Sequence, residues 1–541
     1  MIHYTCTAAI GRLFTRNVRE GSPSHGLQVE VESDLESDES QHTRYAPCFP
    51  MSYQLSKTQP TRNRPSTLVH LLDDDSLLII FSFCRPVILD QSEVEGDHQL
   101  IEGGKWNRER WWYRLIQVCR RWRYIVLDSA FHLQVSLVCG RGTPVADMLA
   151  HSPPVPLIID HIDEEYDVLT PEDEEGIILA LQHRDRIRRI RITKSNSILQ
   201  KLVIALGGEF PILEYLLISN RRDTRPFIDL ITSLSFPESF RTPHLRHLCL
   251  DNFATPIESP ILTTMANLVT LWLSSIPSSG YFHPNALLQR LSLMPQLETL
   301  GIGFHCYNSR RDIEEQLLRT PITTQVRLPN LHWLMFDGTS DYLEALLPWL
   351  TIPLLKRLDI HFFNQMVYSI PHLRQLTNTA GNLRLKVALV NFREDLIRLS
   401  GYPDKGARLT TLYMGLGGRH LDWQVVSAAQ VFHALKTVFS AVEHLDLRYS
   451  RHNISSEWNN QADLLHWREV LGSFGKVKTL RVEYGLVEQV SRAIQPEGDS
   501  PTELFPELQE LSYSRRVVSR AFALFIDARQ KAGRPLTVNH I

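Results

Sequence analysis

Several residue groups in this chain of 541 residues have the types that catalytic sites use, but their spacing completes no site. The run Gly472-Ser-Phe-Gly475-Lys lacks the four-residue spacing, and the Ser or Thr after Lys, that a phosphate-binding loop needs. Asp160-His161 and His420-Leu-Asp422 bring an acid near a histidine, but no nucleophile stands at a supporting motif. We interpret these residues as surface or capping residues and expect that the protein is not an enzyme.

The seven cysteines could bind zinc or form disulfides, and their spacing favours neither. They form no Cys-X-X-Cys pair and no Cys–His cluster at zinc-finger spacing. Their positions are Cys6, Cys48, Cys84, Cys119, Cys139, Cys249 and Cys306. We expect no metal, no cofactor, reduced thiols, and a cytoplasmic or nuclear location.

A run of arginines could bind a phosphorylated or acidic substrate. The run consists of Arg184, Arg186, Arg188, Arg189 and Arg191. Isoleucines stand between these arginines, at Ile187, Ile190 and Ile192. The same alternation is typical of a strand entry with solvated outward charges, which is the interpretation we favour.

Composition excludes two partner classes. The 57 Lys and Arg residues against 60 Asp and Glu residues give a formal net charge of −3, so the surface is not generally basic. We therefore expect no nucleic-acid partner and no anionic-membrane partner. Arg, Asp or Pro interrupts every hydrophobic run before it reaches the ~18–20 residues that span a bilayer.

A repeated pattern predicts the elements that would position a binding site. The template is a hydrophobic residue, two variable residues, a hydrophobic residue, one variable residue and a hydrophobic residue. It occurs eleven times, at 187–192, 213–218, 245–250, 268–273, 297–302, 331–336, 355–360, 409–414, 442–447, 477–482 and 508–513. With a degenerate unit at Leu383–Val387 the units recur about every 29 residues, as in leucine-rich repeats.

Helical patterns lie between these strands, for example at 342–350, 428–435 and 464–471. We therefore predict an α/β fold in which residues 134–541 form an irregular leucine-rich-repeat solenoid, with parallel strands on its concave side and helices on its convex side. The template's asparagine, three residues after the third hydrophobic residue, is replaced by residues such as Phe253 and His305. Missing asparagines and uneven spacing both predict an irregular array.

Two amphipathic stretches precede the repeats. Leu77, Ile80, Phe81 and Cys84 fall on one helical face, and Asp73 or Asp74 can cap that helix. A second stretch keeps helical spacing at Trp112, Leu115, Cys119, Trp122 and Val126. We predict a helical domain at 68–133 with an inserted loop at 85–107, after a disordered acidic tail at 1–67.

Leu72–Phe81 and Val118–Val126, in this order and ahead of leucine-rich repeats, resemble an F-box, and the chain is similar to the F-box proteins that are numerous in fungi. Asp73 stands where that family usually has Pro, and Ser76 where it has an aliphatic residue. The resemblance implies a Skp-type adaptor as partner and, through it, cullin and RING subunits. It also implies which residues contact the adaptor: Leu72, Leu77, Leu78, Ile80, Phe81, Val118, Cys119 and Trp122.

The resemblance implies the substrate-recognition subunit of an SCF-type ubiquitin ligase. The alternative is an interaction scaffold built on leucine-rich repeats, without a ligase role. In either case we expect an unknown protein target on outward residues of the repeat strands. The candidates are Arg246, His247, Thr270, Trp272, His332, Trp333, Lys356 and Arg357.

Overall fold

The computed structural model divides the chain into two compact units, which are described separately. It describes residues 71–85, 111–162, 170–194, 196–220, 236–305, 320–363, 365, 367–407, 409–418, 420–450, 464–495, 504–513 and 520–540. The predicted tail at 1–67 and, beyond Arg85, the predicted loop at 85–107 lie outside these residues. The helical unit comprises 71–85 and 111–129, and the sheet unit begins at Ala130.

The helical unit contains α2 (Asp74–Cys84), α4 (Tyr113–Ile116) and α5 (Arg120–Asp128). The Asp73 carboxylate caps α2 by accepting the Ser76 backbone N–H at 2.6 Å. This hydrogen bond to the charged form holds the pKa of Asp73 below its usual range. The predicted cap is therefore confirmed, with Asp73 as the capping residue.

The second amphipathic stretch is two helices, so the prediction of one continuous helix was wrong. Cys119 has an extended backbone, with φ −160° and ψ 171°, and its Sγ accepts the Trp122 N–H at 3.5 Å. The chain thus ends α4 and starts α5 anew with a cysteine as the cap. Helical spacing of apolar residues cannot reveal such a break, because α4 and α5 both remain near the same core.

The sheet unit is built on one sheet of 16 strands in the part of the chain that the structure describes. In spatial order the strands are β1 (Leu137–Gly140), β2 (Leu157–His161), β3 (Ile187–Lys194), β4 (Tyr215–Asn220), β5 (His247–Asp251), β6 (Thr270–Ile276), β7 (Thr299–Phe304), β9 (Trp333–Gly338), β11 (Arg357–Phe362), β14 (Leu412–Gly417), β13 (Leu396–Tyr402), β12 (Val387–Arg393), β15 (His444–Ser450), β16 (Thr479–Val482), β17 (Glu510–Tyr513) and β18 (Thr537–His540). A separate short pair consists of β8 (Val326–Arg327) and β10 (Leu350–Thr351).

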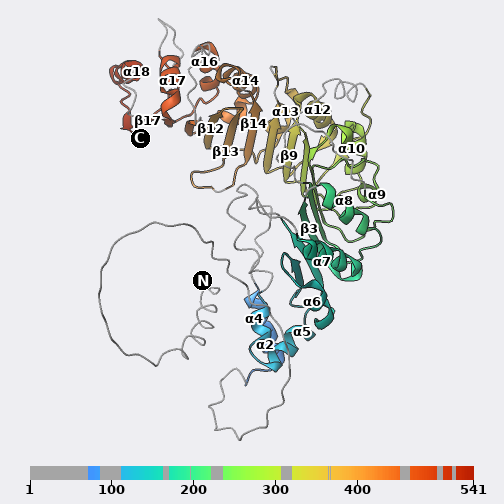
Figure 1. Cartoon of the computed structure of the whole chain (residues 1–541). Coiled ribbons are helices and arrows are strands. Elements are labelled where there is room, and N and C mark those ends of the chain that lie inside the picture. The colour runs from blue at the N-terminus through green and yellow to red at the C-terminus, as the bar shows by residue number, and fades with distance from the viewer. Residues whose placement is uncertain are drawn as a thin grey trace, which may run out of the picture. The chain divides into compact units, whose positions relative to one another are not determined.

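The helices of the sheet unit lie along one face of the sheet (Figure 1). They are α6 (Val145–His151), α7 (Pro171–Gln182), α8 (Asn196–Ala205), α9 (Pro260–Thr263), α10 (Pro284–Leu291), α12 (Ser340–Leu346), α13 (Pro371–Thr379), α14 (Leu421–Ala434), α15 (Lys436–Phe439), α16 (Leu464–Gly472), α17 (Val487–Ala493) and α18 (Arg520–Lys531). We call the opposite side of the sheet the helix-free face, since none of the described helices of the sheet unit lies on it.

The eleven sequence templates all fall on strands of this sheet, which confirms the repeat prediction. Successive side chains of a strand point to opposite faces, so the second and third hydrophobic residues share one side. In β5 these are Leu248 and Leu250, with 0% and 2% of their surface exposed; in β9 they are Leu334 and Phe336, with 2% and 1%. They form the core between sheet and helices, and the residues between them lie on the helix-free face.

The sheet departs from the prediction around the degenerate unit. Strands β12 and β13 form an antiparallel hairpin, and β13 pairs antiparallel with β14. The chain therefore places β14 beside β11 and places β12, which comes earlier in the sequence, beside β15. The expectation of parallel strands stacked in chain order was wrong here, because the two-residue turn at Glu394-Asp395 reverses the chain at once.

Two asparagines replace part of the missing asparagine ladder. Asn220 ends β4 and Asn252 follows β5, each one position earlier than the template places its asparagine. The Asn252 amide donates to the Asn220 carbonyl at 2.9 Å, and the Asn220 amide donates to the Asn252 carbonyl at 3.5 Å. Asn252 has φ 58°, a left-handed conformation that asparagine tolerates. The template positions themselves hold no asparagine, as predicted, and these two asparagines pair one position earlier.

Candidate functional site

The helical unit has its own core, and this core uses two of the predicted adaptor contacts. Leu77 and Phe81 are 1% and 0% exposed. Phe81 meets the ring of Trp122 edge to face, with 4.8 Å between ring centroids and an interplanar angle of 61°. Arg121 joins the helices further, since its guanidinium donates to the Leu72 carbonyl and to the Asp74 carboxylate.

The other predicted adaptor contacts are only partly accessible. Half-buried members are Leu72, Leu78, Ile80, Cys119 and Trp122, and Val118 is 45% exposed. The most exposed apolar side chains on or beside α2 are instead Leu71 at 74%, Ile79 at 58% and Phe83 at 62%. Ile79 and Phe83 are four residues apart and so share a face. The sequence carried this signal, because the run from Leu77 to Phe81 is apolar on every side.

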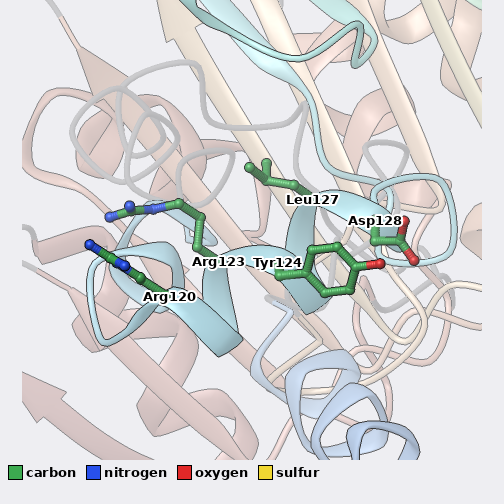
Figure 2. Close-up of a pocket in the computed structure, with 5 residues that line it drawn as sticks. All are labelled: Arg120, Arg123, Tyr124, Leu127 and Asp128. Carbon is green, nitrogen blue, oxygen red and sulfur yellow. The ribbon is translucent and has the colours of Figure 1, made fainter.

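Helix α5 also lines an open depression of about 440 Å³ (Figure 2). Its described lining residues are Arg120, Arg123, Tyr124, Leu127 and Asp128. Figure 2 shows all five on the same helix, so these side chains form one wall and no enclosed cavity. Tyr124 is 67% exposed. This surface adds an aromatic ring and two cations to the accessible side of the helical unit.

On the helix-free face, strand register brings most of the predicted target residues into two rows. His247, Thr270, Trp333 and Arg357 stand in the first row, together with Thr299. Trp272 stands in the second row, which continues through Cys249, Gly301, Met335, Asp359 and Tyr413. Arg246, His332 and Lys356 precede their strands by one residue and join neither row.

Trp333 is the centre of a polar and aromatic cluster. Its indole N–H donates to Asp359 Oδ2 at 2.9 Å, and the Arg357 guanidinium lies over its ring at 4.0 Å from the centroid. Arg357 also pairs with Asp359 Oδ2 at 2.8 Å. Trp272 meets Trp333 edge to face, with 5.2 Å between centroids. Trp333 is consequently only 3% exposed, so the accessible aromatic ring here is the half-buried Trp272.

Glycines make room for this cluster. A Cβ at Gly301 would stand 2.6 Å from the Trp272 ring, and a Cβ at Gly415 would stand 2.6 Å from the His361 ring. A Cβ at Gly303 would come 3.2 Å from Asp337 Oδ2. The side chains of Trp272, His361 and Asp337 therefore lie over bare backbone of the neighbouring strand.

Two carboxylates that sequence reasoning missed lie in this region. Asp337 pairs in register with His361, and Asp359 pairs with Met335, so the two acids are diagonal neighbours on one face. Burial raises the pKa of Asp359, although Arg357 and Trp333 lower it. Burial, with Asp359 close by, raises the pKa of Asp337 to about 7. Asp359 occupies a variable position of its template unit and Asp337 directly follows its unit, which is the only signal that the sequence gave.

Most arginines of the run have partners elsewhere in the sheet unit. Arg191 forms a buried ion pair with Asp160 at 3.1 Å, and Arg188 pairs with Glu214 at 2.9 Å. Arg186 donates to backbone carbonyls, and Arg189 lies over the Tyr215 ring at 4.6 Å. The expectation of solvated outward charges was wrong for these four arginines, because neighbouring segments supply partners that the sequence does not place, whereas Arg184 is exposed as expected.

Two classes of site find no support in the described residues. None of the described helices is long and apolar enough to cross a membrane. No group of three or more His, Cys, Asp or Glu side chains in the described ranges is arranged to hold a metal ion.

Comparisons with known proteins add little to this geometry. No protein-family model matches the chain, and no curated protein matches it. Among solved structures it is similar to the leucine-rich repeat-containing protein LegL7 from Legionella pneumophila, with 11% sequence identity and a TM-score of 0.26. The match covers 74% of this chain and 98% of that one. The repeat architecture therefore rests on the strands and their register.

Proposed function

We propose that this protein is a substrate receptor of an SCF-type ubiquitin ligase. The helical unit would bind a Skp-type adaptor, and the helix-free face would bind the protein to be modified. The observation that carries this proposal is the exposure of Leu71, Ile79 and Phe83 beside an already complete core. Large apolar side chains gathered on so small a unit favour a protein partner.

In this function the chain makes and breaks no bond. The adaptor, cullin and RING subunits would bring a ubiquitin-charged conjugating enzyme, and the helix-free face would hold the target near it. Tethering raises the effective concentration of the target's lysines at the enzyme, which accelerates transfer without new chemistry. The mixture of aromatic, cationic and anionic residues around Trp333 supports protein recognition on that face.

Co-expression of the full chain with a Skp-type adaptor tests the proposal. We expect the adaptor to co-purify, and we expect the double variant Ile79→Asp with Phe83→Asp to lose it. Both residues are largely exposed, so the helical unit should stay folded, whereas replacing Leu77 would disrupt its core. Leu524→Asp is the matched control, since Leu524 is 60% exposed on α18 of the sheet unit.

Two results would contradict the ligase role. In the first, the folded wild-type chain does not retain the adaptor; in the second, the double variant retains it as well as Leu524→Asp does. The alternative, an interaction scaffold without a ligase role, would then stand. The departures of Asp73 and Ser76 from the F-box pattern favour that alternative.

A further inference from the structure

The acids of the helix-free face differ in how they are neutralised. Asp251 accepts hydrogen bonds from Ser219 and Ser274, each at 2.8 Å. Asp446 pairs with Arg448 at 2.8 Å. Asp337 has neither a hydrogen bond nor an ion pair within the part of the chain that the structure describes. It is the acid on this face whose charge the protein leaves uncompensated.

The neighbour of Asp337 sharpens this contrast. Asp359 is 7% exposed, and its Oδ1 has no hydrogen-bond partner among the described residues, while Oδ2 takes both Trp333 and Arg357. Two carboxylates are thus diagonal neighbours, and the one guanidinium beside them pairs with Asp359 alone. Such an arrangement is costly unless a second cation arrives, because like charges in a poorly hydrated site repel each other.

Arg357 shows how this surface accommodates a cation. Its guanidinium lies on the Trp333 ring and pairs with the Asp359 carboxylate. Trp272 on β6 and Asp337 on β9 offer the same two components, a ring and a carboxylate, on the two strands that flank β7. In the rows of Trp272 and Asp337, β7 contributes Gly301 and Gly303, so no side chain of β7 covers its backbone at these two positions.

The remaining charged groups around Asp337 do not neutralise it. Strand β11 contributes Arg357, already bound to Asp359, and His361, whose pKa is lowered by burial and by Arg398. Beyond them, β14 contributes Tyr413, and β13 contributes Arg398, which is three strands from Asp337 in their common row. The pKa of Tyr413 is raised by burial and by both acids.

We propose that Trp272 and Asp337, here called the acidic site, bind one lysine or arginine side chain of the protein target. The cation would lie on the Trp272 ring and pair with Asp337, as Arg357 does with Trp333 and Asp359. This inference rests on the proposed function, because it assigns the chemistry by which the helix-free face would recognise its target.

A charge-isostere experiment on the full-length protein tests the acidic site. The probes are the peptides acetyl-Gly-Arg-Gly-amide and acetyl-Gly-Lys-Gly-amide, with the citrulline peptide as the neutral isostere of arginine. Affinity is measured by ligand-observed NMR titration at about pH 8. We expect saturable binding of both basic peptides, and binding of the citrulline peptide that is weaker by about tenfold, because one charge-assisted contact is lost.

Matched variants locate the binding. Asp337→Asn keeps the side-chain shape and removes the charge, so it should lower the affinity for both basic peptides about tenfold. Asp404→Asn is the control, since Asp404 is an exposed acid paired with Lys386; it should change affinity by less than about twofold. Lowering the pH to about 5.5 should weaken wild-type binding, because Asp337 takes up a proton, and should leave Asp337→Asn unchanged.

Three outcomes would overturn the acidic site: no saturable binding of either basic peptide, equal binding of the citrulline peptide, or an undiminished affinity in Asp337→Asn. Preference for acetyl-Gly-phosphoserine-Gly-amide would also overturn it and would direct attention to Arg398. Adaptor co-purification by the wild-type chain, measured beside its peptide binding, separates this proposal from the proposed function. A wild-type chain that retains the adaptor but binds neither basic peptide rejects the acidic site alone.

Discussion

The Trp333 indole N–H donates to the Asp359 carboxylate at 2.9 Å, across the neighbouring strands β9 and β11. A buried indole usually needs such a partner, and the bond fixes one carboxylate oxygen of Asp359 beside Arg357. It also keeps an acid next to Asp337. One cross-strand hydrogen bond thus organises the polar and aromatic cluster of the helix-free face.

Trp333→Phe should destabilise the sheet unit by about 1–3 kcal/mol, because it leaves a buried carboxylate oxygen with one partner fewer and removes ring area beneath Arg357. Urea unfolding followed by circular dichroism measures this change. Trp423→Phe is the control, since Trp423 is 48% exposed and its replacement should cost less than about 0.5 kcal/mol. Equal unfolding midpoints for the two variants would show that the hydrogen bond from Trp333 to Asp359 makes no net contribution to stability.

Asp337 should make stability depend on pH. Its pKa is raised from the ordinary 3.8 to about 7, so the folded protein holds a proton that the unfolded chain has released. The resulting stabilisation is complete below about pH 4 and is lost as the pH rises through about 7. Asp337→Asn should remove this slope and should be more stable than the wild type at pH 8, by about 1–2 kcal/mol after allowance for partial solvent screening. Unfolding midpoints measured between pH 4 and 8 test the direction of this pH dependence. A midpoint that rises with pH in the wild type but not in Asp337→Asn would contradict it.

Gly301→Ala should displace Trp272. The new Cβ would stand 2.6 Å from the Trp272 ring, so the ring must move or the strands must separate, at a cost of about 1–3 kcal/mol. Gly475→Ala is the control, because nothing lies within 4 Å of the added Cβ. Thermal unfolding of both variants measures the cost. A Gly301→Ala protein as stable as the control would show that Trp272 does not depend on this bare backbone.

Phe81→Ala and Phe83→Ala should separate the core of the helical unit from its surface. Phe81 is 0% exposed and packs on Trp122, so its truncation should cost about 3–5 kcal/mol and release α2 from α5. Phe83 is 62% exposed, and its truncation should cost less than about 0.5 kcal/mol. Hydrogen exchange of the α2 and α5 amides measures both effects. Similar protection in the two variants would contradict the assignment of the helix faces.

The sequence by itself determined the strands of the repeats and the start of the first helix. The template depends on residues within six positions of one another, and so does the bond from Ser76 to the Asp73 cap. Alternation of apolar residues at this range fixes which side of each strand enters the core. For that reason Leu248 and Leu334 could be placed before any contact between strands was known.

Only the tertiary structure decided which residues meet across strands. Asp337 and Asp359 are neighbours because β9 and β11 pair in one register, and Arg191 finds Asp160 in the same way. The reversal at Glu394-Asp395 also changed the order of the strands. Register and order depend on hydrogen bonds between segments tens of residues apart, which no local pattern encodes. The run from Leu77 to Phe81 showed that α2 has an apolar excess, and the packing of α5 decided that Ile79 is the exposed member.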